Sequence, residues 1–171
     1  GRLAGRVAVV TGAGSGIGRA TVLRFVEEGA AVVANDLSED ALEATLAAAR
    51  SLGSGVHGQQ GDITQVEAND ALVAAALQHF GQLDIFHCNA GGAQPVPLLD
   101  TSDDDYRAQL ALNLDSVWFG ARAALRAMVP KRSGVILATT SGAGLGAVAG
   151  LAAYGAAKAG VIALVRSIAL E

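Results

Sequence analysis

Residues 7–18 read Val-Ala-Val-Val-Thr-Gly-Ala-Gly-Ser-Gly-Ile-Gly and decide the fold. The apolar run Val7–Val10 is typical of a parallel strand that is buried on both faces. A glycine-rich turn follows it, and a helical pattern begins at Ile17. Glycine lets a backbone approach a pyrophosphate closely, and the free N–H groups of the next helix attract the anion. The strict G-x-G-x-x-G spacing is absent, but Gly12, Gly16 and Gly18 in this position still predict a turn that binds dinucleotide phosphates.

Apolar runs alternate with helical patterns along the rest of the chain. We expect further strands at Ala31–Asn35, Val56–Gln60, Leu83–Cys88 and Gly134–Thr140. Helices are expected at Ile17–Glu28, Glu39–Leu52, Gln65–Phe80, about Asp103–Val129, and from about Ala153 to the end. This alternation predicts an α/β fold, a doubly wound parallel sheet with helices on both faces, of the Rossmann type. Residues 1–171 are expected to form one such domain, with its ligands at the carboxyl ends of the strands.

Several helix ends carry chemical signals. Gly29 and Gly53 stand where a helix end needs a left-handed residue. Ser38 is placed to cap the helix that follows it. Two pairs have the spacing of a capping box, Thr64 with Glu67 and Ser102 with Asp105.

Composition excludes several classes of protein. Of the 171 residues, 51% are hydrophobic and 16% charged, which argues for a packed core and against disorder. The net charge of −4 makes nucleic acid an improbable partner. A single Cys excludes a disulfide framework and fits a reducing, cytoplasmic setting. Residues 133–157 carry no charge and are long enough to span a membrane. Six glycines and several hydroxyl side chains interrupt them, so a buried strand, a loop and a helix are expected instead, with no membrane partner.

An acidic residue follows the second expected strand. Asp36 comes 18 residues after Gly18, where a carboxylate can bind both ribose hydroxyls of an adenosine and repel a 2′-phosphate. Ser15 and Leu37 supply no compensating positive charge. The sequence therefore predicts NAD rather than NADP. The alternative is that Asp36 is a solvated loop acid or a helix cap.

Three side chains form a candidate catalytic group. Tyr154 and Lys158 are four residues apart and share one face of a helix. A phenol ordinarily titrates near pH 10, and a neighbouring ammonium favours its ionised form. Ser141 lies at the end of the fifth expected strand and can hold a substrate carbonyl or alcohol beside the phenol. Taken alone, the Tyr–Lys pair is also what a surface helix would carry. Together with the glycine turn and Asp36, the three side chains predict proton transfer to a substrate oxygen.

On these motifs the chain resembles the short-chain dehydrogenase/reductase family, over essentially its whole length. Asp62, Asn89-Ala90-Gly91 and Asn113 match further family motifs, in the family's order. The resemblance implies that Tyr154 is the general acid/base, and that Lys158 binds the nicotinamide ribose and assists Tyr154. It also implies that Ser141 orients the substrate oxygen and that Asn113 holds a water of the proton relay. It also implies cofactor contacts from Gly12, Ser15, Gly16, Ile17, Gly18, Asp36, Leu37, Asp62, Ile63, Asn89, Ala90, Gly91, Tyr154 and Lys158.

The chain departs from the family pattern in two places. Cys88 stands where the family usually has a first Asn, and we expect it to support its strand rather than take part in chemistry. The family also continues beyond the last helix with further strands and a substrate lid. We therefore expect Glu171 to be followed by more chain, and Gly134–Thr140 to have an unpaired edge here.

The remaining candidates receive structural interpretations. His57, His79 and His87 lack metal-ligand spacing, so no metal is expected. Asp103, Asp104 and Asp105 start a helix rather than bind calcium. Trp118 and Phe119 are expected to pack in the core or between helices. The family pattern implies that the small-residue last helix and the one around Ala108–Met128 form the interface of a homo-oligomer, a tetramer or a dimer.

The leading hypothesis is an NAD(H)-dependent oxidoreductase that interconverts a secondary alcohol and a ketone by direct hydride transfer. Its substrate region, Gly91–Leu99 and Gly142–Ala152, contains no charge, so a neutral or apolar small molecule is expected. The alternative is a non-catalytic NAD-binding or scaffold protein. A nucleotide-binding methyltransferase is weaker, because its chemistry needs no Tyr–Lys pair.

Overall fold

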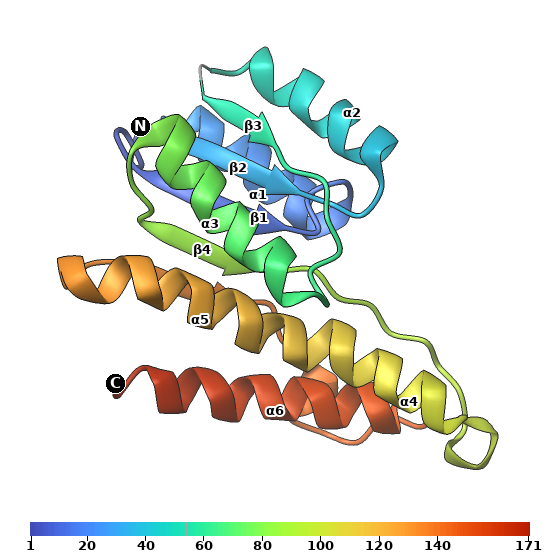
Figure 1. Cartoon of the computed structure of the whole chain (residues 1–171). Helices are drawn as coiled ribbons and strands as arrows, with labels where there is room; N and C mark the ends of the chain where they lie inside the picture. Colours follow the sequence, from blue (N-terminus) through green and yellow to red (C-terminus); the bar gives the residue numbers. More distant parts are fainter. Residues whose placement is uncertain (54) are drawn as a thin grey trace.

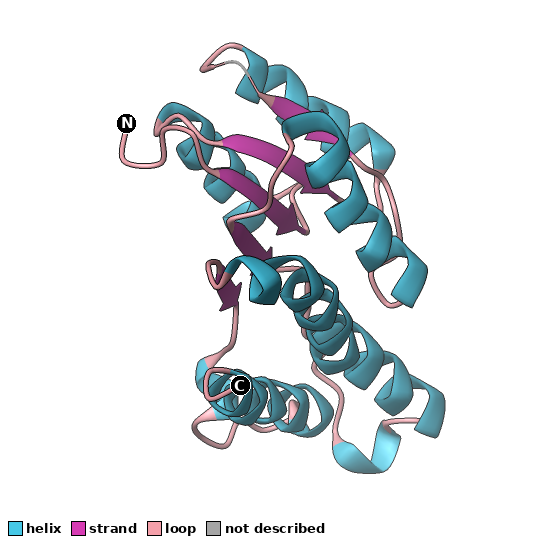
Figure 2. Ribbon diagram, turned by 60° about the vertical axis from the view of Figure 1, so that its left-hand side comes forward, coloured by secondary structure: helices cyan, strands magenta, loops and turns pink. Residues whose placement is uncertain are grey.

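The computed structural model describes residues 1–53 and 55–171, and in these residues a five-stranded parallel sheet lies between two layers of helices (Figure 1, Figure 2). The strands are β1 (Val7–Thr11), β2 (Ala31–Asn35), β3 (Val56–Gly58), β4 (Ile85–Cys88) and β5 (Val135–Ala138). Their order is β3-β2-β1-β4-β5, and all four pairings are parallel. The chain therefore winds outward in both directions from β1 and β4, which confirms the predicted doubly wound fold.

The helices begin and end within a few residues of their predicted bounds, with one exception. They are α1 (Gly16–Glu27), α2 (Glu39–Arg50), α3 (Val66–Phe80), α4 (Asp103–Leu110), α5 (Ser116–Met128) and α6 (Ala152–Ile168). Short 3-10 turns lie at Leu98–Asp100, Val129–Lys131 and Gly142–Gly144. The exception is the predicted helix at Asp103–Val129, because a π-helical turn at Ala111–Asp115 separates α4 from α5.

Alternating residues of the strands face two separate apolar layers. Val9, Val33 and Phe86 pack against α3, α5 and α6, where Leu72, Val117 and Val161 are buried. On the other face, Ala8, Val10 and Val32 pack against α1 and α2, where Val22, Leu42 and Leu46 are buried. Since side chains of a strand alternate between faces, a continuous apolar run is what a doubly covered sheet requires.

Strand β5 is covered on one face only. Ile136 and Ala138 pack against the layer that contains α5, whereas Val135 and Leu137 on the opposite face are 51% and 42% exposed. Within the described residues β5 pairs with β4 alone, so the predicted unpaired edge is present.

Three of the five predicted caps are confirmed. Gly29 has the left-handed φ of +88°. The side chains of Ser38 and Ser102 accept hydrogen bonds from Ala41 N at 3.3 Å and Asp105 N at 3.0 Å, at the starts of α2 and α4.

Two cap predictions are wrong. Thr64 and Glu67 form no capping box, because α3 begins after Gln65 and the Thr64 hydroxyl donates to Asp62 Oδ1 at 2.8 Å instead. Gly53 is not a left-handed cap, since α2 already ends at Ser51 in right-handed backbone. The cap that the sequence analysis missed is Gly81, which ends α3 with φ +78°.

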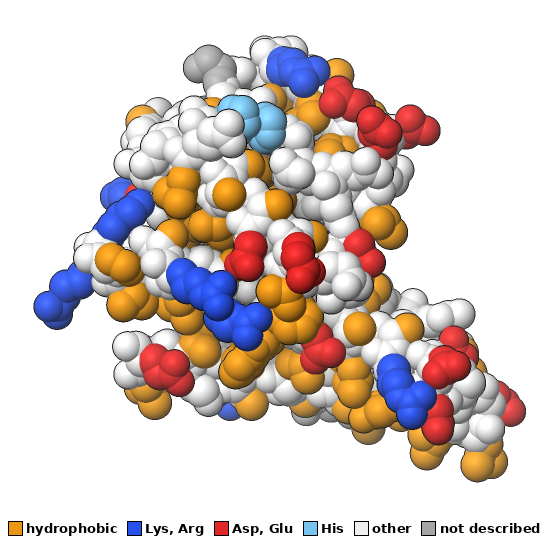
Figure 3. Space-filling view, in the orientation of Figure 1, with side chains coloured by type: hydrophobic (Ala, Val, Ile, Leu, Met, Phe, Trp, Pro, Cys, Tyr) orange, Lys and Arg blue, Asp and Glu red, His pale blue; other side chains and the backbone are white. Residues whose placement is uncertain are grey.

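The prediction for Trp118 is also wrong. This side chain is 51% exposed, because it lies on the side of α5 away from the buried residues Val117, Ala121 and Ala124. Phe119 is partly buried, and the Arg122 guanidinium lies 5.7 Å from its ring centre. Hydrophobic side chains are also visible along α5 and α6 in the space-filling view (Figure 3).

Among the helices of residues 1–53 and 55–171, none has the length and apolar character that crossing a membrane would need.

Candidate active site

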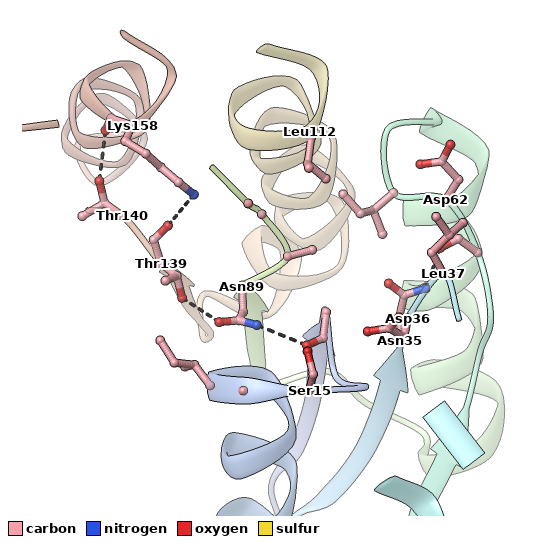
Figure 4. A pocket seen from close by; sticks show the side chains of 18 of the residues that line it. Ser15, Asn35, Asp36, Leu37, Asp62, Asn89, Leu112, Thr139, Thr140 and Lys158 are labelled. Carbon is pink, nitrogen blue, oxygen red and sulfur yellow. Dashed lines mark hydrogen bonds between the residues drawn. The ribbon is translucent and has the colours of Figure 1, made fainter. Parts of the chain in front are cut away.

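The carboxyl ends of β1, β2, β4 and β5 open into one cleft of about 570 Å³ (Figure 4). The predicted site residues that line it are Gly12, Ser15, Gly16, Ile17, Asp36, Leu37, Asp62, Ile63, Asn89, Ala90, Gly91, Tyr154 and Lys158. Gly18, Asn113 and Ser141 do not line it. Gly92 lines it as well and belongs to the predicted substrate segment Gly91–Leu99. The sequence analysis missed five lining residues, Asn35, Gly61, Leu112, Thr139 and Thr140. Residues from both halves of the chain therefore meet in one space.

The glycine turn between β1 and α1 has no room for larger side chains at Gly12, Gly14 and Gly18. A Cβ on Gly18 would lie 2.0 Å from the Gly12 carbonyl oxygen, and one on Gly14 would lie 2.8 Å from Asp36 Oδ2. Gly16 has a φ of +50° and open space around the position of a Cβ. Ser15 precedes α1, but its side chain accepts no capping hydrogen bond from that helix. The first N–H groups of α1 are thus left for a partner in the cleft.

Asp36 lies at the end of β2 and closes one side of this turn. Its Oδ2 accepts a hydrogen bond from Gly14 N at 2.7 Å, and its Oδ1 accepts one from Ser38 N at 3.0 Å. These two bonds fix Asp36 to the turn, and its side chain also lines the cleft. An ionised carboxylate has about four lone-pair positions, so two bonds leave it able to accept more.

Asn89 joins the ends of neighbouring strands. Its backbone N–H and that of Ala90 both donate to Thr11 Oγ1, at 3.0 and 3.1 Å. Its side-chain Nδ2 donates to the Thr11 carbonyl at 3.0 Å. The motif after β4 is thereby fixed to the start of the glycine turn.

Asn113 occupies the π-helical turn and is fully buried. Its Oδ1 accepts from Gly92 N at 3.0 Å, and its Nδ2 donates to Gly92 O at 3.0 Å and to Gln109 O at 3.1 Å. The amide thus holds both backbone groups of Gly92 while it satisfies a carbonyl of the helix. Its observed contacts fix the cleft wall and do not reach the cleft itself.

Tyr154 and Lys158 lie on α6 and are brought together as predicted. Lys158 Nζ is 5.7 Å from the Tyr154 ring centre and donates to the Thr139 carbonyl at 2.9 Å (Figure 4). The lysine is only 2% exposed, and burial lowers its pKa below the usual range. In the described part of the chain no carboxylate forms an ion pair with it. An ammonium of this kind is strongly disposed to take an oxygen ligand from the cleft.

Ser141 stands beside the cleft rather than in its wall. Its Oγ accepts a hydrogen bond from Ala143 N at 3.2 Å and caps the short turn Gly142–Gly144. A hydroxyl has one donor and two acceptor positions. In the part of the chain that the structure describes, its O–H donates to no other residue and can serve another oxygen.

Cys88 supports its strand, as predicted. The thiol is buried, and burial raises its pKa to about 12. Its Sγ lies 3.9 Å from the Val117 carbonyl on α5. A thiol this hard to ionise is a poor nucleophile and a poor metal ligand.

The histidines do not form a metal site within residues 1–53 and 55–171, where no group of three or more potential ligands gathers. His57 and His79 stack with their ring centres 3.8 Å apart. Burial, and then the charge of His79, lowers the pKa of His57, while burial lowers that of His87.

Mild acid should destabilise the fold through these two imidazoles. Because the pKa values of His57 and His87 are lower in the folded state than in the unfolded chain, the unfolded chain binds more protons below about pH 6.5. The free energy of unfolding should rise with pH up to that value and level off above it. We expect a lower urea midpoint at pH 5.5 than at pH 7.5, and a smaller difference in His87→Gln.

The titration of Glu28 does not contribute to the difference between pH 5.5 and pH 7.5. Hydrogen bonds from the backbone and side chain of Arg2 lower the Glu28 pKa to about 2, so its titration lies below pH 4.5. A urea midpoint that is the same at pH 5.5 and pH 7.5 would contradict the role of the histidines.

Comparison with known proteins agrees with this geometry. The family model for short chain dehydrogenase matches residues 6–171. The 3beta-hydroxysteroid dehydrogenase 2 of Eggerthella lenta is 38% identical over 169 residues, which cover 98% of this chain and 65% of that protein. The chain spans about two thirds of the length of the curated relatives that it matches.

Solved structures show the same fold. Levodione reductase superposes with a TM-score of 0.95 at 31% identity, covering 99% of this chain and 67% of its own. NAD⁺-bound xylitol dehydrogenase superposes with a TM-score of 0.95 at 35% identity, covering 99% and 66%. With its parallel sheet, its glycine turn and a family match from Arg6 to the last residue, this chain belongs to the short-chain dehydrogenase family.

Proposed function

We propose that this chain holds NAD(H) in the cleft and supports the interconversion of a secondary alcohol and a ketone. One observation carries the proposal. Lys158 with Tyr154, and the glycine turn with Asp36, line the same cleft. Its volume of about 570 Å³ is within the usual range for small-molecule sites. On this proposal residues 1–171 act as one cofactor-binding domain.

The residues present fit a dinucleotide. Gly12, Gly14, Gly18 and Gly91 each lie so close to neighbouring atoms that a Cβ would come within 2.8 Å of one. Gly16 is open, and the uncapped start of α1 lies beside it. This is a shape that a pyrophosphate can approach without a side chain in its way. Asp36 and Leu37 would hold the adenosine ribose, Asp62 and Ile63 the adenine, and Asn89, Ala90, Gly91 and Lys158 the nicotinamide end.

The side chains then divide the remaining work. A bound nicotinamide supplies the hydride acceptor or donor. Tyr154 would give a proton to the substrate oxygen or take one from it, as the general acid/base. Lys158 would hold ribose oxygens and stabilise the ionised phenol by its charge. Ser141 would use its O–H to orient the substrate oxygen. Asn113 would position Gly92 and any water bound beside it.

The substrate region should favour a neutral or apolar molecule. The segments 91–99 and 142–152 contain no charged residue and are joined by a hydrogen bond from Val96 N to Gly150 O at 2.9 Å. Leu145 and Val148 are exposed in the second segment. Two of the related proteins named above are dehydrogenases of a hydroxysteroid and of xylitol, both alcohols. The proposal is therefore a hydroxyl-bearing substrate without strong charge.

Two steps test the proposal. NADH fluorescence, titrated with the purified chain, should show saturable binding. A panel of uncharged secondary alcohols with NAD should then give NADH formation. Binding without turnover on any alcohol would favour the alternative, a binding or scaffold protein. The absence of NADH binding would overturn the proposal as a whole.

Asp36 should set the preference for NAD over NADP. We expect Asp36→Ala to reduce the ratio of the association constants for NAD and NADP about tenfold or more. A charged hydrogen bond to the NAD ribose is worth about 1.5–3 kcal/mol, and the repulsion of a 2′-phosphate is removed. Asp36→Asn is the matched control, since its amide oxygen can still accept from Gly14 N. An unchanged ratio in both variants would show that Asp36 serves the turn alone.

We also propose a homo-oligomer, a tetramer or a dimer, in a cytoplasmic setting. Trp118 and Val129 are exposed on or next to α5, and hydrophobic side chains lie along α5 and α6 (Figure 3). Such a surface is better accounted for by a partner subunit than by solvent. Light scattering at several concentrations tests this.

A further inference from the structure

We propose that His87 is a positioning residue, which acts through Thr139 to fix the side-chain amide of Asn89 at the nicotinamide end of the cleft. His87 lies on β4 two residues before Asn89, so both side chains extend from the same face of the sheet. Thr139 follows β5, the next strand. Asn89 belongs to a motif on which the function was predicted, whereas His87 and Thr139 do not.

Four hydrogen bonds lead from His87 through Thr139 and Asn89 to the glycine turn. His87 Nε2 lies 3.0 Å from Thr139 Oγ1. The same hydroxyl lies 3.0 Å from Asn89 Oδ1 (Figure 4). Asn89 Nδ2 then donates to Thr11 O at 3.0 Å and to Gly12 O at 3.4 Å, where the phosphate turn begins.

The chemistry of the groups fixes the direction of each bond. Asn89 Oδ1 is an acceptor only, so the single hydrogen of the Thr139 hydroxyl must point to it. The Thr139 oxygen can therefore only accept from His87, and His87 Nε2 must carry a hydrogen. With Oδ1 held in this way, the Asn89 amide cannot rotate by half a turn, and Nδ2 stays directed at the glycine turn.

The surroundings of Nδ1 indicate that His87 does not increase the stability of the fold. The side chain is only 8% exposed, and Nδ1 is buried with no hydrogen-bond partner within the described residues. An apolar side chain of similar size would avoid that cost. Burial also lowers the pKa of His87, which keeps the ring neutral near pH 7.5. The group that an apolar residue cannot supply is the Nε2 donor.

Thr139 connects this row to the catalytic side of the cleft. Its carbonyl accepts the hydrogen bond from Lys158 Nζ at 2.9 Å. One residue therefore holds Asn89 through its side chain and Lys158 through its backbone. That the cleft receives a nicotinamide rests on the proposed function, whereas the hydrogen-bond row itself does not.

The first experiment examines the row without any cofactor. Long-range ¹H–¹⁵N NMR of the purified, ¹⁵N-labelled chain at pH 7.5 should find the His87 proton on Nε2. In Thr139→Val, which removes the acceptor, the ¹⁵N shifts of His87 should change. A proton on Nδ1 in the unmodified chain would overturn the proposal, because Thr139 would then have to donate to His87 and could not hold Asn89.

The second experiment measures NADH binding by fluorescence in matched variants. His87→Leu should weaken NADH binding by about fivefold to tenfold, the effect of one lost hydrogen bond. His87→Gln keeps an amide N–H near the position of Nε2 and should restore most of the affinity. The urea midpoint of His87→Leu at pH 8 should not fall, whereas a purely structural histidine would lower it. Combined with Thr139→Val, His87→Leu should add little further loss of binding.

Unchanged NADH affinity in His87→Leu, or a Gln variant that binds as weakly as the Leu variant, would overturn the role of His87. If the unmodified chain itself fails to bind NADH, the proposed function is wrong, and the NMR result still decides the hydrogen-bond row. If the Leu variant does not fold, the comparison of His87→Gln with Thr139→Val replaces it. The Gln variant should then bind NADH nearly as well as the unmodified chain, and the Val variant about tenfold more weakly.

Discussion

Tyr154→Phe should abolish turnover while NADH binding remains measurable. Phe keeps the ring beside Lys158 Nζ, which lies 5.7 Å from the ring centre, and removes only the hydroxyl that would exchange a proton with the substrate. In the described residues that hydroxyl makes no internal hydrogen bond, so its loss should not disturb the fold. General acid/base groups contribute about 10²–10⁴-fold to a rate. We expect kcat to fall by at least about 10²-fold.

Tyr106→Phe is the matched control for this variant. Tyr106 is the other tyrosine of the chain, and it lies half-exposed on α4. It should keep full activity. Retained turnover in Tyr154→Phe would assign the proton transfer to another group. Loss of NADH binding together with turnover would point instead to a damaged cleft.

Gly18→Ala should produce the largest loss of stability of any conservative change in the turn. A Cβ at this position would lie 2.0 Å from the Gly12 carbonyl oxygen and 2.6 Å from Asn89 Nδ2, so helix α1 would have to move away from β1 and β4. Overpacking of a core usually costs about 1–3 kcal/mol, and here the clash is with backbone. We expect the free energy of unfolding to fall by about 3 kcal/mol or more.

Urea denaturation checks this prediction, with Gly92→Ala as the control. Gly92 has ordinary backbone angles and nothing within 4 Å of the position of a Cβ. Its replacement should change the midpoint little, and NADH binding should decide whether the cleft is intact. Equal midpoints for the two alanine variants would mean that the turn relaxes around the new methyl group.

Features with a short-range pattern in the sequence were predictable. The strand Ala31–Asn35 is confirmed to the residue, because an apolar run between a glycine and an acidic turn leaves little choice. The approach of Tyr154 to Lys158 follows from helical spacing alone. Ser38 and Ser102 act on N–H groups three residues away. In each case the interacting groups are neighbours along the chain or on one element.

Features that depend on distant neighbours were not predictable. The hydrogen bond between His87 Nε2 and Thr139 Oγ1 joins residues 52 positions apart, and no pattern marks either of them. Thr64 had the spacing of a cap, yet its hydroxyl donates a hydrogen bond to the nearer Asp62 carboxylate. Trp118 follows Asn113 at helical spacing and was expected in the core or between helices, although the rotation of α5 decides its exposure. The π-helical turn also gave no local signal, since its residues suit an ordinary helix.

That turn has a geometric consequence for the long rod formed by α4 and α5 (Figure 1). In the π turn Ser116 N donates to Ala111 O, five residues back instead of four, so the rod contains one residue more than an uninterrupted helix of the same length. Each residue of a helix turns it by about 100°. The extra residue therefore sets a phase offset between the two segments. Through it α4 can face α6 while α5 faces α3 and the sheet. Deleting one residue of the turn would bring the two faces into phase, and one of the two helices would then present its polar side to its neighbour.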